Sequence, residues 1–245
     1  LRLTNASVGV FPRQRSETVS LASSNAYLAV DETLTGQLEA GDRRRLSAYD
    51  QLAKITASDG TDYFGMSVAA SGDLLVVGAY RDSDGGSLSG AAFVYVTTDG
   101  GATWNEVSKL TASDAVANNY FGVSVAISGD IIVVGASGFY DSHVWSSSRA
   151  GAAYVFRTTD GGSTWSQTAK LTATDAAGGD GFGWSVAAAD NLIIIGAPYD
   201  DIEGGSGGWQ SGTGSAYMYE TTDGGNSWTE VYKLMQDDAG TKKWE

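Results

Sequence analysis

Short unbroken runs of apolar residues recur along the chain and are its clearest local signal of secondary structure. They lie at residues 74–77, 131–134 and 192–195, and each is bounded by clusters of Gly, Asp, Ser or Asn, which form turns. A strand with one face in water should alternate apolar and polar residues, so these runs predict strands in a sheet that is covered on both faces. Because no segment has helical periodicity, we expect other sheets to provide that cover.

The runs belong to a unit of about sixty residues that is written three times. Phe64, Phe121 and Phe182 are its corresponding positions. Each copy predicts four strands, which in the first copy are GMSVAA, DLLVVGA, GAAFVYV and TWNEVSKLTA. Repeated units of this kind bury their apolar faces against their neighbours. Four-stranded sheets stacked around one axis do so and leave only short edges, so the pattern predicts an all-β fold, a β-propeller of antiparallel blades.

The spacing of the copies also predicts the domain organisation, which is one propeller segment over residues 1–245. We expect blades at about 11–57, 58–114, 115–175 and 176–238, the first of them degenerate because it lacks the turn motif before its last strand. Residues 239–245 are expected to begin a further, truncated blade, with Trp244 near the position of the phenylalanines. Since the chain starts without Met and stops inside a unit, we interpret it as a fragment with about four blades of a longer protein.

The repeated motif resembles that of a known family. Each copy carries Phe-Gly, then a strand that ends in Gly-Ala, and then Gly-Ala or Gly-Ser before an aromatic strand; the third copy alone completes Gly-Ala-Pro, at residues 196–198. This pattern resembles the FG-GAP repeat of integrin α-subunit propellers and of many bacterial and algal surface proteins. The resemblance covers roughly residues 18–245. It implies a seven-bladed propeller that works by binding, with closure supplied by chain beyond this segment.

A second motif, TTDGGATW and its variants TTDGGSTW and TTDGGNSW, resembles the Asp-box hairpin of sialidases and other propellers. We expect it to be structural. The Asp can accept hydrogen bonds from backbone N–H groups of its own turn, the adjacent glycines permit positive φ, and the Trp can cover the blade edge. The predicted hairpin residues are Asp99, Trp104, Asp160, Trp165, Asp223 and Trp228.

Calcium is the cofactor that the FG-GAP resemblance implies. In integrin-like repeats the loop between the second and third strands can carry a D-x-D-x-D-G motif, whose oxygens suit a hard cation. The candidate ligands are Asp82 and Asp84 in the first copy and Asp200, Asp201 and Glu203 in the third. Both loops depart from the motif, the first in its number of acidic residues and the second in its spacing, so solvated acidic turns are the alternative. The acidic clusters at residues 59–62 and 175–180 are further candidates for a cation site or a turn.

Charge and composition restrict the partners. The chain has 29 acidic and 15 basic residues, a formal net charge of −14 and a pI near 4.3. This balance argues against nucleic acid as a partner and against contact with an anionic membrane. The sequence contains no Cys, so it forms neither a disulfide nor a thiolate site. One glycosylation sequon, at Asn5, is compatible with an extracellular protein.

Catalytic constellations are scarce in this sequence. The single histidine, His143, lies in the long loop between the second and third strands of the middle copy. A sialidase would need an arginine cluster at the propeller centre, and none of the nine arginines recurs at a strand start. We therefore expect not an enzyme but an extracellular or cell-surface protein that binds a protein or glycan partner or assembles with copies of itself. The alternative is a sialidase-like hydrolase whose active site lies in missing blades.

Overall fold

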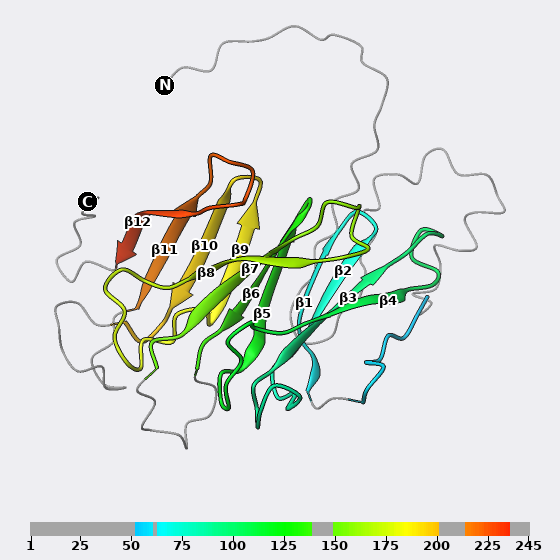
Figure 1. Ribbon diagram of the computed structural model, residues 1–245, viewed down its shortest axis with the longest axis horizontal. Helices are drawn as coiled ribbons and strands as arrows, with labels where there is room; N and C mark the ends of the chain where they lie inside the picture. The colour runs from blue at the N-terminus through cyan, green and yellow to red at the C-terminus, as the bar shows by residue number, and fades with distance from the viewer. Residues whose placement is uncertain (1–51, 61–62, 139–148, 201–213, 236–245) are drawn as a thin grey trace, which may run out of the picture. The chain divides into compact units, whose positions relative to one another are not determined.

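A computed structural model describes residues 52–60, 63–138, 149–200 and 214–235, and every regular element in these ranges is a β-strand (Figure 1). The prediction of an all-β fold is confirmed. In the same ranges no helix has the length and hydropathy that crossing a membrane requires. The strands are β1 (Phe64–Ser71), β2 (Leu74–Ala79), β3 (Ala91–Val96), β4 (Asn105–Leu110), β5 (Phe121–Ser128), β6 (Ile131–Ala136), β7 (Ala152–Arg157), β8 (Ser166–Leu171), β9 (Ser185–Ala189), β10 (Leu192–Ala197), β11 (Ser215–Glu220) and β12 (Thr229–Met235).

The strands form three antiparallel sheets of four, and each sheet is a meander in chain order: β1–β4, β5–β8 and β9–β12 (Figure 1). We name these sheets the first, second and third blades. They occupy residues 64–110, 121–171 and 185–235, so one sheet lies within each of the ranges 58–114, 115–175 and 176–238. The degenerate blade expected at 11–57 falls almost entirely outside the described residues, as does all of 239–245.

Tight turns join the first two strands of each blade. In the first two blades the turn is Ser-Gly-Asp, where Gly72 and Gly129 have φ values of +58° and +56°. A positive φ favours glycine, which has no Cβ to clash with the backbone. The third blade places Asp190 at this point with a φ of +49°, and Asp is among the residues that tolerate this region best.

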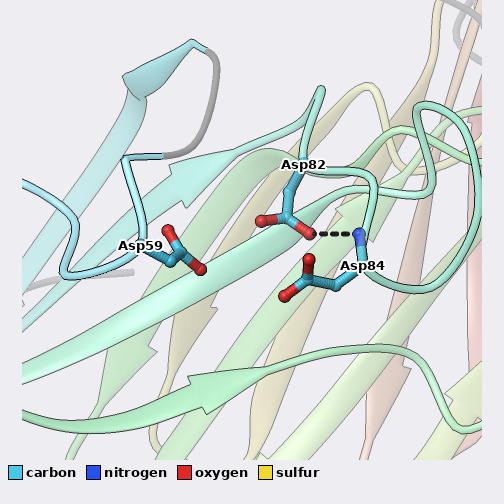
Figure 2. A group of neighbouring side chains, drawn as sticks. All are labelled: Asp59, Asp82 and Asp84. Atoms are coloured by element: carbon cyan, nitrogen blue, oxygen red, sulfur yellow. Dashed lines mark hydrogen bonds between the residues drawn. The ribbon is translucent and has the colours of Figure 1, made fainter.

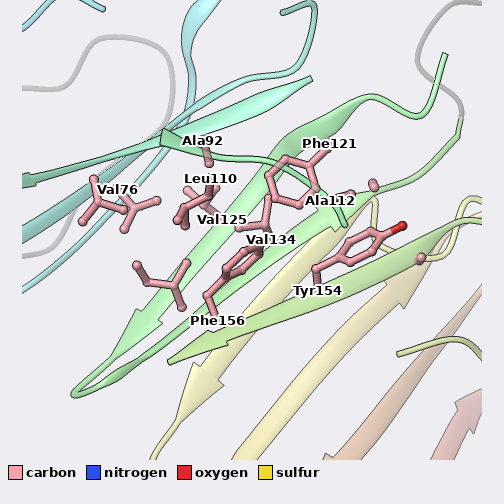
Figure 3. Close-up of a cluster of buried hydrophobic side chains, with 13 residues drawn as sticks. Val76, Ala92, Leu110, Ala112, Phe121, Val125, Val134, Tyr154 and Phe156 are labelled. Carbon is pink, nitrogen blue, oxygen red and sulfur yellow. The ribbon is translucent and has the colours of Figure 1, made fainter. Parts of the chain in front are cut away.

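The hydrophobic core lies between successive blades. Between the first and second blades, Val76 and Val94 of one sheet pack with Phe121, Val134 and Tyr154 of the next, and all five are fully buried (Figure 3). Each cluster thus combines one face of a sheet with the opposite face of its neighbour, as expected for stacked repeats. The matching cluster between the second and third blades includes Val133, Val155, Phe182, Ile193 and Tyr217.

The two glycine motifs of the repeat meet at the joint between blades. Gly122, from Phe-Gly, has a φ of +88°, and a Cβ on it would lie 2.2 Å from the carbonyl oxygen of Ala91. Gly78, from Gly-Ala, faces it so closely that a Cβ there would lie 2.1 Å from the Gly122 carbonyl oxygen. That oxygen accepts a hydrogen bond from Ser67 Oγ at 2.8 Å. The second joint repeats these contacts with Gly183, Ala152, Gly135 and Ser124.

The third blade departs from the expectation drawn from the apolar runs. In the second blade, residues 131–134 are all buried, as predicted for a strand covered on both faces. In the third blade, residues 192–195 alternate between partly buried and buried. Ile193 and Ile195 pack against the second blade, whereas Leu192 and Ile194 lie on the far face of the sheet. Within the described residues this run is therefore covered by a blade on one face only, and cover of the other face would have to come from a further blade.

Candidate cation site at the ends of the blades

The predicted site residues fall at two opposite ends of the blades. In an antiparallel meander, the hairpin between the third and fourth strands lies at one end and the connection between the second and third strands lies at the other. The hairpin end carries Asp99, Asp160 and Asp223. The connection end carries Asp82, Asp84 and Asp200.

The hairpin aspartate organises its own turn in every blade. In the second blade, Asp160 Oδ1 accepts the Thr164 N–H at 2.9 Å and the Thr158 hydroxyl at 2.8 Å. Asp160 Oδ2 accepts the Thr164 hydroxyl at 2.6 Å. Thr158 is itself buried and accepts the N–H of Gly162 at 2.9 Å. Asp99 and Asp223 accept the corresponding bonds.

These hydrogen bonds stabilise the charged form of each hairpin carboxylate. The hydroxyl and N–H donors of Thr103 lower the pKa of Asp99 from 3.8 to about 2. The equivalent donors of Thr164 and Ser227 lower the pKa of Asp160 and of Asp223 to about 2 as well. Each of these carboxylates is therefore ionised at neutral pH and accepts hydrogen bonds from its own hairpin.

The hairpin also rests on the preceding blade, which its own sequence does not reveal. A Cβ on Gly162 would lie 2.5 Å from Cδ2 of Leu74, and a Cβ on Gly225 would lie 2.8 Å from Cδ1 of Ile131. Trp165 packs on the core between the first and second blades and donates its Nε1–H to the Gly162 carbonyl oxygen at 2.9 Å. The second glycine of the hairpin is thus small because a neighbouring blade lies against it.

At the other end of the first blade, three carboxylates converge on one lysine. Asp82 and Asp84 follow β2, and Asp59 precedes β1; one oxygen from each lies within 4.8 Å of the other two (Figure 2). The Asp82 side chain is 1% exposed, and its Oδ1 accepts the Asp84 N–H at 3.0 Å. Lys109 Nζ donates to Asp59 at 2.5 Å, to Asp82 at 2.8 Å and to Asp84 at 2.6 Å.

The register of the sheet sets the position of Lys109. This residue of β4 lies directly opposite Phe93 of β3, and its Nζ lies 5.2 Å from the centre of the Phe93 ring. Partial burial alone would lower the pKa of Lys109, but its hydrogen bonds to the three aspartates outweigh burial and raise the pKa above its ordinary value. The ammonium is therefore charged throughout the physiological pH range.

The second blade has a lysine at the same position, and the described part of this blade provides it with a smaller set of carboxylates. Lys170 lies opposite Tyr154 in the sheet, with its Nζ 5.5 Å from the ring centre. It donates to Asp114 at 2.5 Å. Burial would lower the pKa of Lys170, and the bond to Asp114 reverses the direction of the shift. This repeat has Phe139 at the position of Asp82, and that residue lies outside the described part of the chain.

In the third blade, two of the described carboxylates bond the lysine. Lys233 donates to Asp175 at 2.5 Å and to Asp200 at 2.7 Å. The Asp200 side chain is 5% exposed and also accepts a hydrogen bond from the Ser215 hydroxyl. Asp180 is buried nearby and accepts a backbone N–H at 2.6 Å. Burial, together with the charges of Asp200 and Asp175, raises the pKa of Asp180.

One carboxylate at each lysine comes from the preceding repeat. Asp59, Asp114 and Asp175 each end a Lys-Ile/Leu-Thr-Ala-Ser/Thr-Asp segment, and each bonds the lysine of the repeat that follows. The residue before each of these aspartates is also tied to the following blade. Its partners across the repeat boundary are Glu106 for Ser58, Gln167 for Ser113 and Glu230 for Thr174.

The first-blade cluster does not fit Ca²⁺ while Lys109 is in place. Calcium takes about six to eight oxygen ligands at roughly 2.3–2.6 Å. Asp59, Asp82 and Asp84 offer suitable oxygens, but Lys109 Nζ lies within 2.8 Å of one oxygen of each. The ammonium thus lies where these oxygens converge, and a divalent ion would be repelled by it at short range. The donor set fits a bound ammonium instead.

The structure therefore groups the candidate ligands differently from what the sequence suggested. It brings Asp82 and Asp84 together, and it adds Asp59, which the sequence offered only as part of a separate cluster. Asp200 lies instead in the third blade with Lys233. The lysines were not predicted as site residues, although their recurrence five residues before an aspartate was visible in each copy. Three candidates, Asn5, Asp201 and Glu203, lie outside the described residues, as does the single histidine, His143.

Comparison with known proteins places the chain in a family. No curated protein sequence matches it. The crystal structure of the Saccharomyces cerevisiae Sqt1 is similar with a TM-score of 0.42 and 11% sequence identity, over 71% of this chain and 37% of that chain. This chain thus spans well under half of that protein. The family model of the FG-GAP repeat matches residues 49–95, 104–156 and 165–219, which is more than half of the chain. The chain belongs to the FG-GAP repeat family.

Proposed function

We propose that the chain is a segment of an extracellular or cell-surface β-propeller that binds a protein or glycan partner or assembles with copies of itself. In this proposal the segment has no catalytic activity. FG-GAP repeats build propellers that are often extracellular and involved in binding, which supports the general class. The observation that carries the proposal is the contrast between what the blades share and where they differ.

The residues that the blades share have structural roles. The Phe-Gly joint, the hairpin aspartate and the lysine joint recur from blade to blade with the same partners. The connections between the second and third strands, at residues 80–90, 137–151 and 198–214, differ in length, charge and aromatic content. Packing constrains the scaffold and leaves these connections free to vary, which is typical of binding loops on a rigid framework.

The described carboxylates support a binding role over hydrolysis. Those that are buried or have shifted pKa values are held in turns or paired with lysines, and the carboxylates that lie close together, in the first and third blades, bond Lys109 and Lys233. A glycosidase needs two carboxyl groups, about 5–10 Å apart, that are free to act on either side of one bond. The acidic surface, with a net charge of −14, favours neutral or basic partners.

Calcium is an expectation of the family resemblance, and the proposed function does not depend on it. The described acidic cluster holds Lys109 at the centre where an ion would bind. The third-copy candidates Asp201 and Glu203 lie outside the described residues.

A loop exchange tests the proposal. Residues 198–214 are replaced by residues 80–90, which connect the equivalent strands of the first blade, so the sheet should keep its register. Wild-type and exchanged chains are compared on an array of defined glycans and by sedimentation velocity for self-association. We expect binding or self-association in the wild type and at least a tenfold loss in the exchanged chain, with an unchanged melting midpoint. Hydrolysis of a fluorogenic glycoside by the wild type, abolished by a substitution within this segment, would contradict the proposal.

A further inference from the structure

The lysine at the connection end of each blade is positioned to replace a metal ion. We propose that Lys109 serves as the built-in cation of the first-blade carboxylate cluster, so that this joint between repeats is ordered by a side-chain ammonium and does not take up calcium. Lys233 serves the third-blade cluster in the same way. Removal of Lys109 would then turn the first cluster into a calcium site.

The carboxylates need a cation at this point. Asp82 is almost fully buried, and its neighbours Asp59 and Asp84 each bring an oxygen within 4.8 Å. A buried carboxylate without a compensating charge is strongly destabilising, and nearby like charges add to the cost. Lys109 Nζ bonds one oxygen of each aspartate and so meets this need from within the chain.

The lysine position does not depend on how many carboxylates surround it. In all three blades the lysine lies opposite an aromatic residue of the neighbouring strand, and the ammonium lies 5.1 to 5.5 Å from the ring centre. Among the described residues, the number of bonded carboxylates nevertheless changes from three to one to two along the chain. The strand register therefore sets the position of the ammonium, and the acidic connections then supply carboxylates to it.

This series supplies a matched control. Lys109→Met keeps an apolar stem of similar length but leaves three converging carboxylates, whose oxygens are ligands of the kind that calcium takes. Lys170→Met removes the same charge from the same strand position, and among the described residues it leaves Asp114 as the carboxylate that Lys170 had bonded. A calcium site should arise in the first variant and not in the second.

The experiment measures the melting midpoint of wild type, Lys109→Met and Lys170→Met in excess chelator and in about 1 mM CaCl₂, a concentration at which extracellular calcium modules bind. Wild type should melt at the same temperature in both. Lys109→Met should melt about 5 °C lower in chelator, as expected when a buried carboxylate loses its charged partner in a chain of this size. Calcium should restore at least half of that loss. Lys170→Met should melt lower in both solutions without recovery.

Three results would overturn the proposal: a saturable rise of the wild-type midpoint with calcium, an unchanged midpoint of Lys109→Met in chelator, or equal recovery of both variants. If Lys109→Met does not fold in chelator, its refolding from urea decides. Refolding with CaCl₂ but not with chelator supports the substitution, and refolding in neither overturns it. Calorimetric titration of wild type with CaCl₂ is independent of any variant, and saturable binding there would also refute the proposal.

Discussion

Val133 of β6 and Ile194 of β10 occupy the same position in successive repeats, but their surroundings differ. Both lie on a central strand, in register with Val155 and Met218 of the following strand. Val133 is fully buried because the third blade packs over it, whereas Ile194 is only partly buried on the far face of the third blade. Two nearly identical strands thus differ in burial because, within the described residues, only one has a blade packed on that face. A repeat carries an apolar face in its own sequence, but the next repeat determines whether that face is buried.

The polar contacts of the two faces differ in the same way. Ser124 Oγ donates across the joint to the Gly183 carbonyl oxygen at 2.8 Å. Its counterpart in the third blade, Ser185, is exposed. The contrast between the covered and the uncovered face can therefore be tested with matched substitutions at equivalent positions.

The largest expected effect comes from a charge placed in the covered face. Val133→Asp puts a carboxylate among apolar side chains between two blades, and we expect it to lower the free energy of unfolding by about 4 kcal/mol or more. Ile194→Asp places the same charge on the partly exposed face and should cost about 1 kcal/mol. Urea unfolding followed by circular dichroism measures both. Equal losses would mean that the far face of the third blade is covered.

A smaller effect is expected from a methyl group added at the Gly-Ala position. In Gly135→Ala the new Cβ would lie 2.0 Å from the Gly183 carbonyl oxygen, so the joint must open, at about 3 kcal/mol. In Gly196→Ala the nearest atom is Ser185 Oγ at 2.3 Å, and that side chain can rotate away, so we expect about 1 kcal/mol. Thermal unfolding of the pair provides the measurement. A Gly196→Ala variant as unstable as Gly135→Ala would argue against an open third face.

The hydroxyl pair should show a difference of about one hydrogen bond. Ser124→Ala removes the donor to Gly183 and leaves a buried carbonyl oxygen without that bond, which we expect to cost about 1 kcal/mol. Ser185→Ala alters an exposed side chain and should change the stability by less than about 0.5 kcal/mol. Both values come from denaturant midpoints at a constant slope. If the order of the two losses were reversed, the joint described for Gly183 would be wrong.

The smallest difference between the second and third blades is expected at the hairpin aspartates, because their hydrogen bonds lie within one repeat. Their folded pKa of about 2 lies below the ordinary value of 3.8, so their contribution to stability is present above pH 3.8 and is lost as the pH falls toward 2. Asp160→Asn and Asp223→Asn should therefore lower the melting midpoint at neutral pH by similar amounts, and each difference from wild type should shrink below pH 3.8. A clearly larger loss for Asp160→Asn would show that the hairpin depends on its neighbours.

The strands were predictable because the same pattern occurs three times in the sequence. The period of the phenylalanines aligned the copies, and the turn residues between apolar runs marked the strand ends. The cover of residues 192–195 was not predictable in the same way. Their composition matches that of residues 131–134, and the difference lies in an adjacent blade that their own sequence does not describe.

The lysine joint was harder to predict, because its members are distant in the sequence. Lys109 bonds Asp84, 25 residues away, and Asp59, 50 residues away in the preceding repeat. Nothing in the local motif Arg81-Asp82-Ser83-Asp84 indicates that its carboxylates bond Lys109. Only the strand register that places Lys109 opposite Phe93 brings the ammonium to the carboxylates.

Hydrogen exchange of β6 and β10 in the wild-type chain, followed by mass spectrometry, compares most directly a strand covered on both faces with a strand covered on one. Both are central strands, with ladder partners on each side, and their sequences are IIVVGA and LIIIGA. Opening β6 exposes apolar surface on two covered faces, whereas opening β10 exposes it on one, so we expect β6 to exchange much more slowly. Exchange of β10 as slow as that of β6 would contradict the conclusion that a neighbouring blade determines the protection of each repeat.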